Sequence, residues 1–226
     1  MMLENFKHRL QFINGFTLKW IALITMAIDH TGMVLFPRCT IMRIVGRLAF
    51  PIYCFLLVEG AVHTSNWKRY LGRLFVFALI SEIPFNLAVS GNVWYLEGQN
   101  VFFTLFLGLA AVLILMHEKR KLLSWILVLG IMFLARYTSV DYGAGGIFFI
   151  VIFYLFRDKL LEKAAAFIAG TLILFGGLET YAILSLAPIL CYNGKRGPRM
   201  KYFFYLFYPA HLLILHLILC WKSGVI

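Results

Sequence analysis

One long apolar segment near the start of the chain limits what the protein can fold into. It reads LKWIALITMAIDHTGMVLFP, from Leu18 to Pro37, and it carries Asp29 and His30 side by side. A charged side chain at the centre of a bilayer costs roughly 3 kcal/mol on insertion scales, so such residues normally face a protein interior or a water-filled cavity. The segment therefore predicts a membrane-embedded bundle in which other helices bring polar partners to this pair.

The composition favours an integral membrane protein built from helices. Hydrophobic residues make up 62% of the chain and charged residues 14%, with a mean hydropathy of +0.86. A soluble domain is usually about half apolar and a quarter charged. The apolar runs are continuous and do not alternate with a period of two, so helices fit better than a β-barrel. We expect one all-α domain over residues 1–226, with no large soluble part.

The apolar runs predict a polytopic transmembrane bundle of about nine spans. We place the spans near residues 18–37, 41–62, 70–89, 99–116, 122–135, 143–156, 161–176, 181–191 and 202–221. The eighth of these is short. Residues 1–16 are expected to form an amphipathic or irregular lead-in, and the first apolar run is expected to remain as an anchor because no small-residue cleavage site follows it.

The net charge of +11 is explained by the loops between the spans. Alternate loops are basic, and those between them carry almost no Lys or Arg, which is the positive-inside pattern. This register puts the N-terminus in the cytoplasm and the C-terminus outside, with Arg38 and Arg43 as exceptions. We expect membrane lipid, and not nucleic acid, around these charges. The basic groups are Lys68–Arg69, Lys119–Arg120–Lys121, Arg157/Lys159/Lys163 and Lys195/Arg196/Arg199/Lys201.

The predicted topology places polar residues of several spans at one depth, in the outer half of the membrane. Four prolines inside spans, at 51, 84, 188 and 209, would each free the helix carbonyl four residues back, and two of these carbonyls lie next to residues of this layer. Two interpretations remain open: a shared, partly hydrated cavity, or a structural network of hydrogen bonds. The layer comprises Asp29, His30, Arg43, Arg47, Glu82, Asn86, Gln99, Asn100, Thr104 and Asp141, with His211 near the middle of the last span.

A second polar group lies on the predicted cytoplasmic side. Its main candidates are Arg73, Lys195 and Arg196, and the last two sit in the glycine-containing loop YNGKRGPR. Arginine, lysine and backbone N–H groups suit a phosphate, so this group could hold a phosphate-bearing ligand. The alternative is an ordinary positive-inside loop.

The chemistry available to these residues outlines an acyl transferase. The chain has no H-E-x-x-H, G-x-S-x-G, P-loop or G-x-G-x-x-G motif, and we assign no metal. Asp29 and His30 project about 100° apart on a helix, so they cannot form a tight pair with each other. A neutral His30 can act as a general base, with Asp29 orienting or charging the site and His211 as a second candidate. Arg47 could stabilise the oxyanion of a tetrahedral intermediate.

In this hypothesis the remaining polar residues divide between the two substrates. The donor's phosphates would be held by Arg73, Lys195 and Arg196. The acceptor side would be lined by Arg43, Arg47, Glu82, Asn86, Gln99, Asn100, Thr104 and Asp141.

Two other function classes remain open. A proton-coupled small-molecule transporter would use Asp29, Glu59 and Glu82 as carriers, although two matching halves are not visible in the sequence. A non-catalytic assembly factor for envelope or pilus components would not depend on His30.

The chain resembles the TraX family, named after the F-pilin acetylase of conjugation systems. The resemblance runs from about Leu18 to Leu213, and blocks of it also look like the wider class of polytopic membrane acyltransferases. It rests on IDHTG, MRIVGRLAFPIYCFLLVEG, RLFVFALISEIPFN, QNVFFTL, DYGAGG, YNGKRG and KYFFYLFYPAHL.

This resemblance implies a multi-pass acetyltransferase of the bacterial cytoplasmic (inner) membrane. It implies acetyl-CoA as the acyl donor, and an amine or hydroxyl as the acceptor, such as a pilin N-terminus or another envelope component. It does not imply an oligomeric state.

Overall fold

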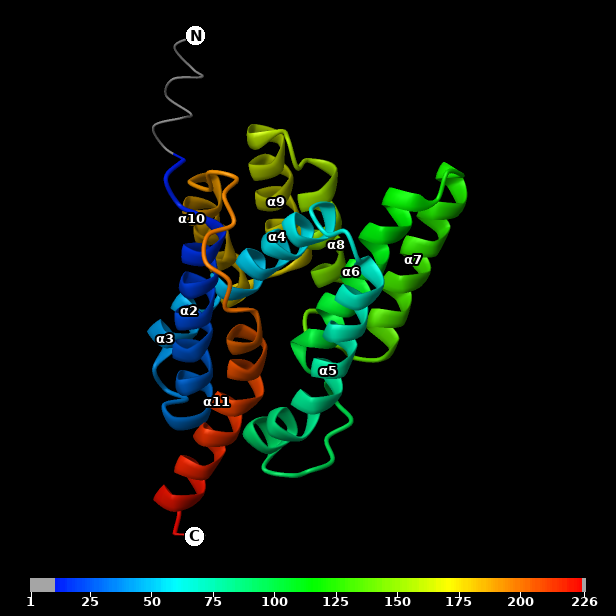
Figure 1. The fold of residues 1–226 in the computed structure, drawn as a ribbon. Helices are drawn as coiled ribbons and strands as arrows, with labels where there is room; N and C mark the ends of the chain where they lie inside the picture. The colour runs from blue at the N-terminus through cyan, green and yellow to red at the C-terminus, as the bar shows by residue number, and fades with distance from the viewer. Residues whose placement is uncertain (1–10, 225–226) are drawn as a thin grey trace.

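The computed structural model describes residues 11–224, and every regular element within that range is a helix (Figure 1). The segment Gly177–Ser185, η1, is a 3₁₀-helix, and the other elements are α-helices. These are α2 (Gly15–Leu35), α3 (Thr40–Gly46), α4 (Ala49–Val62), α5 (Trp67–Ser90), α6 (Val101–His117), α7 (Lys121–Tyr137), α8 (Gly143–Leu155), α9 (Leu160–Leu174), α10 (Leu186–Leu190) and α11 (Lys201–Lys222).

Each predicted span coincides with one helix or with two consecutive helices. Four stretches are long and apolar enough to cross a membrane: α2, Thr40–Val62, α5 and α11. The other helices are shorter, so the number of crossings stays a prediction. Of the expected lead-in, residues 1–10 lie outside the described part of the chain. Asn14 then caps α2, with its side chain accepting a hydrogen bond from the Thr17 N–H at 2.9 Å.

The second predicted span is broken, where a continuous helix over 41–62 was expected. The chain turns at Arg47 and Leu48, between α3 and α4, and the Arg47 N–H bonds to the Ile44 carbonyl at 3.1 Å. Pro51 lies in the first turn of α4, where a missing N–H costs no helical hydrogen bond. The break puts Arg47 at a junction between two helices, and not in the middle of one continuous helix.

The eighth predicted span was expected to be a single short helix, and the structure differs from this. It consists of η1 followed by α10. A 3₁₀-helix longer than 3–4 residues is uncommon, because its hydrogen-bond geometry is poorer than that of an α-helix. The extended η1 segment begins with Gly177, whose φ is +58°. It brings Glu179 next to α3 and α4, which the span prediction did not foresee.

The main core lies between α2, α4, α5, α6, α8 and α11. Its fully buried side chains include Leu18, Ile52, Leu109, Phe153 and Leu212. Helix α7 stands at the edge of the bundle, where it packs on α6 and α8 around a separate small core (Figure 1). The outer faces of α5, α7 and α11 expose many large apolar side chains, as expected for helices that meet lipid.

Two glycines allow α2 and α3 to pack closely together. A Cβ atom on Gly46 would lie 2.2 Å from the Cβ of Asp29, and one on Gly32 would lie 2.7 Å from the Cβ of Met42. Small residues at a membrane helix interface let the two backbones approach. Gly46 is therefore required for the position of the Asp29 side chain.

Replacing Gly46 with Ala should destabilise the protein, because the new methyl group would displace Asp29. Overpacking of this kind costs about 1–3 kcal/mol. Thermal unfolding of the purified protein in detergent measures the loss. Gly130→Ala is the matched control, since no atom lies within 4 Å of a Cβ built there. Equal melting temperatures for Gly46→Ala and the control would contradict the close packing described for α2 and α3.

Candidate functional site

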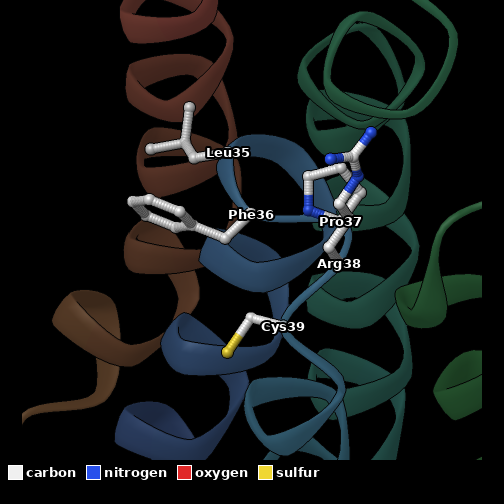
Figure 2. A pocket seen from close by; sticks show the side chains of 5 residues that line it. All are labelled: Leu35, Phe36, Pro37, Arg38 and Cys39. Carbon is white, nitrogen blue, oxygen red and sulfur yellow. The ribbon is translucent and has the colours of Figure 1, made fainter.

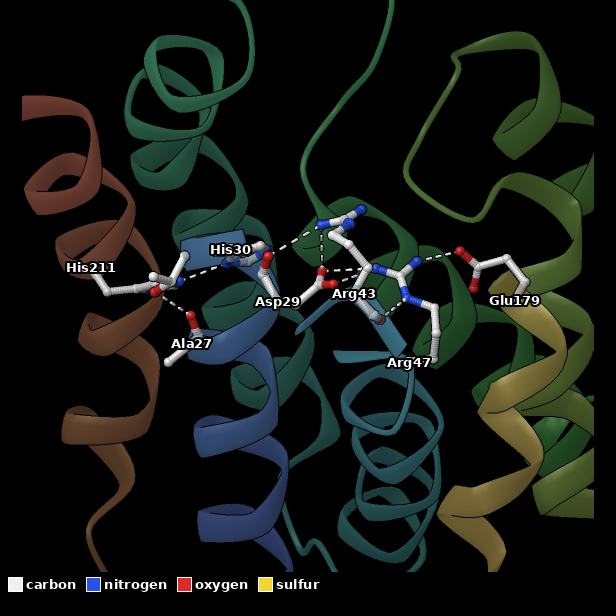
Figure 3. Close-up of polar contacts among 8 residues, drawn as sticks. Ala27, Asp29, His30, Arg43, Arg47, Glu179 and His211 are labelled. Atoms are coloured by element: carbon white, nitrogen blue, oxygen red, sulfur yellow. Dashed lines mark hydrogen bonds and ion pairs between the residues drawn. The ribbon is translucent and has the colours of Figure 1, made fainter. Parts of the chain in front are cut away.

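The Asp29 carboxylate is held by two arginines of the broken second span (Figure 3). Both of its oxygens accept hydrogen bonds from Arg47 Nη2, each at 2.8 Å. Arg43 Nη1 lies 3.0 Å from Asp29 Oδ2 and donates to the Asp29 carbonyl at 3.3 Å. Arg43 and Arg47, two residues of the predicted polar layer, thus both contact Asp29. The buried charge of Asp29 is thus neutralised by α3 and by the junction that follows it.

Arg47 is the most extensively bonded residue of the group. Besides Asp29, its Nε donates to the Arg43 carbonyl at 3.1 Å, and its Nη1 donates to the Glu179 carboxylate. Its side chain is only 8% exposed, against 26% for Arg43. Most of the donors of Arg47 are already used within the protein. The geometry therefore suits Arg47 to positioning Asp29 and Glu179, and it leaves Arg43 as the arginine open to a ligand.

Glu179 is a member of this group that the sequence analysis missed. It comes from η1 and forms an ion pair with Arg47 from the opposite side to Asp29 (Figure 3). Its segment looked like a short outer loop in the sequence. The only available signal was an acidic residue at the predicted outer end of two spans. The Asp141 side chain also interacts electrostatically with Arg47, Glu179 and Asp29.

His30 and His211 form a hydrogen-bonded pair. His30 Nδ1 lies 2.6 Å from His211 Nε2 (Figure 3). His211 Nδ1 lies 2.8 Å from the Phe207 carbonyl oxygen. A carbonyl only accepts, so His211 Nδ1 carries a proton and, in the neutral ring, Nε2 accepts. His30 Nδ1 is then the donor, which leaves the lone pair of His30 Nε2 available. The pair presents His30 Nε2 as a base.

The two imidazole rings meet edge to edge. Their planes differ by 14° and their centroids lie 4.9 Å apart. A nitrogen–nitrogen distance of 2.6 Å is too short for atoms stacked face on face, so the contact runs through the ring edges in nearly one plane. Tyr208 stands at an angle of 69° to the His30 ring, with centroids 5.8 Å apart. Tyr208 and its neighbour Phe102 were not anticipated as part of this site.

Glu82 and Asn100 form the next polar contact. The Asn100 side chain is fully buried, and its Nδ2 donates to Glu82 Oε2 at 2.5 Å and to the Ala78 carbonyl at 2.8 Å. Its Oδ1 accepts the Phe102 N–H at 3.1 Å, which caps α6. This contact joins α5 and α6, the helices of the third and fourth predicted spans. Asn100 is nevertheless saturated by protein groups, which favours a structural role for it.

Four other predicted residues make their contacts with backbone groups. The Asp141 N–H donates to the Gln99 carbonyl at 2.9 Å, and the Thr104 hydroxyl donates to the Asp141 carbonyl. Asn86 instead bonds to the Val93 carbonyl at 2.9 Å and fixes the loop after α5. These contacts account for the burial of the Thr104 hydroxyl and the Asn86 amide nitrogen without a ligand, whereas Asn86 Oδ1 is buried with no hydrogen-bond partner among the described residues.

The predicted phosphate-binding residues are found at two places on the basic end of the bundle. The Arg73 guanidinium lies 5.6 Å from the centre of the Tyr70 ring. Lys195 donates its N–H to Asn193 at 2.9 Å, and its carbonyl accepts the Gly15 N–H at 2.8 Å. Arg196 is the next residue of this loop, and it lies beside the start of α2. Its charge interacts with that of Lys19, a further cation that the sequence analysis did not single out. No direct contact joins Arg73 to this loop within the described residues.

A shallow surface pocket lies at the turn between α2 and α3 (Figure 2). The residues that line it belong to neither the Asp29 group nor the histidine pair, so the polar network and this pocket are separate features. They are Leu35, Phe36, Pro37, Arg38 and Cys39.

Asp29→Asn should destabilise the protein more than Glu179→Gln. Removing the Asp29 charge leaves two guanidinium groups facing each other in a buried site, and breaking a buried ion pair costs about 3–5 kcal/mol. Glu179 is 29% exposed, so solvent compensates part of its loss and about 1 kcal/mol or less is expected. Thermal unfolding of both variants in the same detergent tests this order. Equal losses would show that Asp29 is not the anchor of the network.

Comparisons with known proteins give matches that cover most of the chain. The family model described as TraX protein matches residues 14–219. A probable fimbrial assembly protein FimC of Dichelobacter nodosus is 32% identical, over 89% of this chain and 94% of its own length. Protein TraX of Escherichia coli is 27% identical, over 88% of this chain and 84% of its own. No solved structure matches the chain. The match over residues 14–219 places the chain in the TraX family.

Proposed function

We propose that this protein is a membrane-embedded acetyltransferase that moves an acetyl group from acetyl-CoA to an amine or hydroxyl acceptor. The observation that carries the proposal is the histidine pair. The carbonyl of Phe207 orients His211, and His211 in turn orients His30, so that one ring nitrogen of a partly buried histidine is left as a base. General-base catalysis by such a group typically contributes about 10²–10⁴-fold in rate.

In the proposed reaction, the acceptor nitrogen or oxygen attacks the thioester carbonyl carbon. His30 Nε2 takes the proton from the acceptor as the new bond to carbon forms. The carbon–sulfur bond then breaks, the coenzyme A thiolate leaves, and the proton returns to it from His30. The positive charge on His30 during this step can be shared with His211, by movement of the Nδ1 proton across the 2.6 Å contact.

Arg43 is proposed to stabilise the oxyanion of the tetrahedral intermediate. A cation aimed at a developing negative charge in a poorly hydrated site is a large part of many rate enhancements. Arg43 has one terminal nitrogen on Asp29 and a more exposed side chain than Arg47. Arg47, whose donors are occupied, is assigned to positioning. This assignment replaces the expectation that Arg47 itself contacts the oxyanion.

The donor is proposed to enter from the cytoplasmic side of a nine-span bundle in the bacterial inner membrane. In that arrangement the N-terminus is cytoplasmic and the basic loops carry the phosphates. Lys195 and Arg196 suit this role, and Lys19 supplies a third charge beside them. Arg73 would make a separate contact near Tyr70. The names of the relatives, with fimbrial assembly among them, favour a pilin or another envelope component as the acceptor.

The same names favour a second candidate, a non-catalytic factor in fimbrial assembly. Such a factor would need the fold and the buried ion pairs but not a free lone pair on His30. A substitution of the His30 side chain therefore distinguishes the two candidates.

His30→Gln should abolish acetyl transfer while the fold is kept, because Gln provides no base at this position. His211→Leu should give an intermediate loss, because His30 would keep its base but lose its fixed tautomer. The measurement is transfer from labelled acetyl-CoA in proteoliposomes to added amines and to envelope extract. His117→Gln is the control, since His117 hydrogen-bonds to the Leu113 carbonyl at the far end of α6 and contacts neither Asp29 nor the histidine pair within the described residues.

Unchanged transfer in His30→Gln would overturn the assignment of the base. An absence of transfer in the wild type, together with full rescue of pilus assembly by His30→Gln, would favour the assembly factor.

A further inference from the structure

A groove runs along the outer surface of α5 and α6, at the end of the bundle that carries the basic loops. Its residues take no part in the Asp29 network or the histidine pair. They are Trp67, Lys68, Leu71, Gly72, Phe75 and Phe106.

The middle of the groove is open and apolar. A Cβ atom built on Gly72 would meet nothing within 4 Å, so the helix surface is hollow at that point. Phe75 and Phe106 form one wall, with ring centroids 5.3 Å apart, and Phe75 is 42% exposed. An exposed apolar trough of this kind on a membrane helix fits one extended hydrocarbon chain.

The mouth of the groove is aromatic and positively charged. Lys68 Nζ lies 5.5 Å from the centre of the Trp67 ring, and that ring lies 6.0 Å from His117 at the end of α6. Arg69 is exposed beside them, and the basic turn Lys119–Arg120–Lys121 follows α6 directly. Tryptophan is enriched at the membrane interface, and clustered lysines and arginines there attract anionic headgroups.

We propose that this groove is a binding site for one anionic glycerophospholipid. Its phosphate would contact Lys68 at the mouth, and one acyl chain would cross Gly72 between Trp67 and Phe75. The combination of a hollow at Gly72 and a cation above it distinguishes this place from an ordinary lipid-facing surface. Helix α7 exposes Gly130 on an equally apolar face, but the residues that surround it, from Trp125 to Leu134, include no cation.

The test is native mass spectrometry of the full-length protein, released from detergent containing phosphatidylglycerol or phosphatidylcholine with the same acyl chains. The wild type should retain one phosphatidylglycerol in preference to phosphatidylcholine. Gly72→Leu should abolish the retained lipid, because the new side chain fills the hollow. Lys68→Gln should lower the preference for phosphatidylglycerol about fivefold, the effect of one basic side chain at a membrane surface.

Two controls keep the result specific. Gly130→Leu adds the same side chain at an open position on α7 and should leave phosphatidylglycerol retention unchanged. Inorganic phosphate should not raise the melting temperature of the wild type, which separates a lipid site from a simple phosphate site. Equal retention of the two lipids by the wild type, or unchanged retention by both Gly72→Leu and Lys68→Gln, would overturn the proposal. Because Lys68 is exposed, its variant remains informative even where Gly72→Leu fails to fold.

Discussion

The Asp29 carboxylate accepts hydrogen bonds from Arg47 and contacts Arg43, and the positions of several helices follow from this contact. A buried carboxylate is tolerated only where its charge is matched and its oxygens are bonded. The arginines can reach it because Gly46 leaves no side chain between α2 and α3. Arg47 then extends the network to Glu179. The charge of Asp29 in α2 thereby connects this helix to the break between α3 and α4 and to η1.

The same contact places the histidine pair. His30 follows Asp29 directly, so when Asp29 faces α3 the imidazole points about 100° away around the helix. On that side it meets His211 of α11. The ion-pair network and the histidine pair therefore occupy neighbouring faces of α2. This division explains how two ionisable residues can stand side by side in an apolar segment, each with a partner of its own.

The positions of the helices were largely predictable, because long apolar runs bounded by charged loops leave few alternatives. The partners of Asp29 were also predictable, since Arg43 and Arg47 lie one turn apart and at the expected depth. The break at Arg47 was not, because the run through Pro51 is as apolar as a continuous span. Glu179 was missed because its position depends on a long 3₁₀ segment, for which the sequence gives no periodic signal. Gln99 was expected to contribute a side chain, yet its described contacts with Ser139 and Asp141 use the backbone.

The hydrogen bond from His211 to the Phe207 carbonyl has a wider consequence for how the sequence can vary. The group that decides which nitrogen of each ring carries hydrogen belongs to the main chain. No exchange of the side chain at position 207 can remove it while α11 stays helical. The direction of the hydrogen bonds in the pair is thus set by the helix backbone, and it does not depend on which side chain stands at position 207.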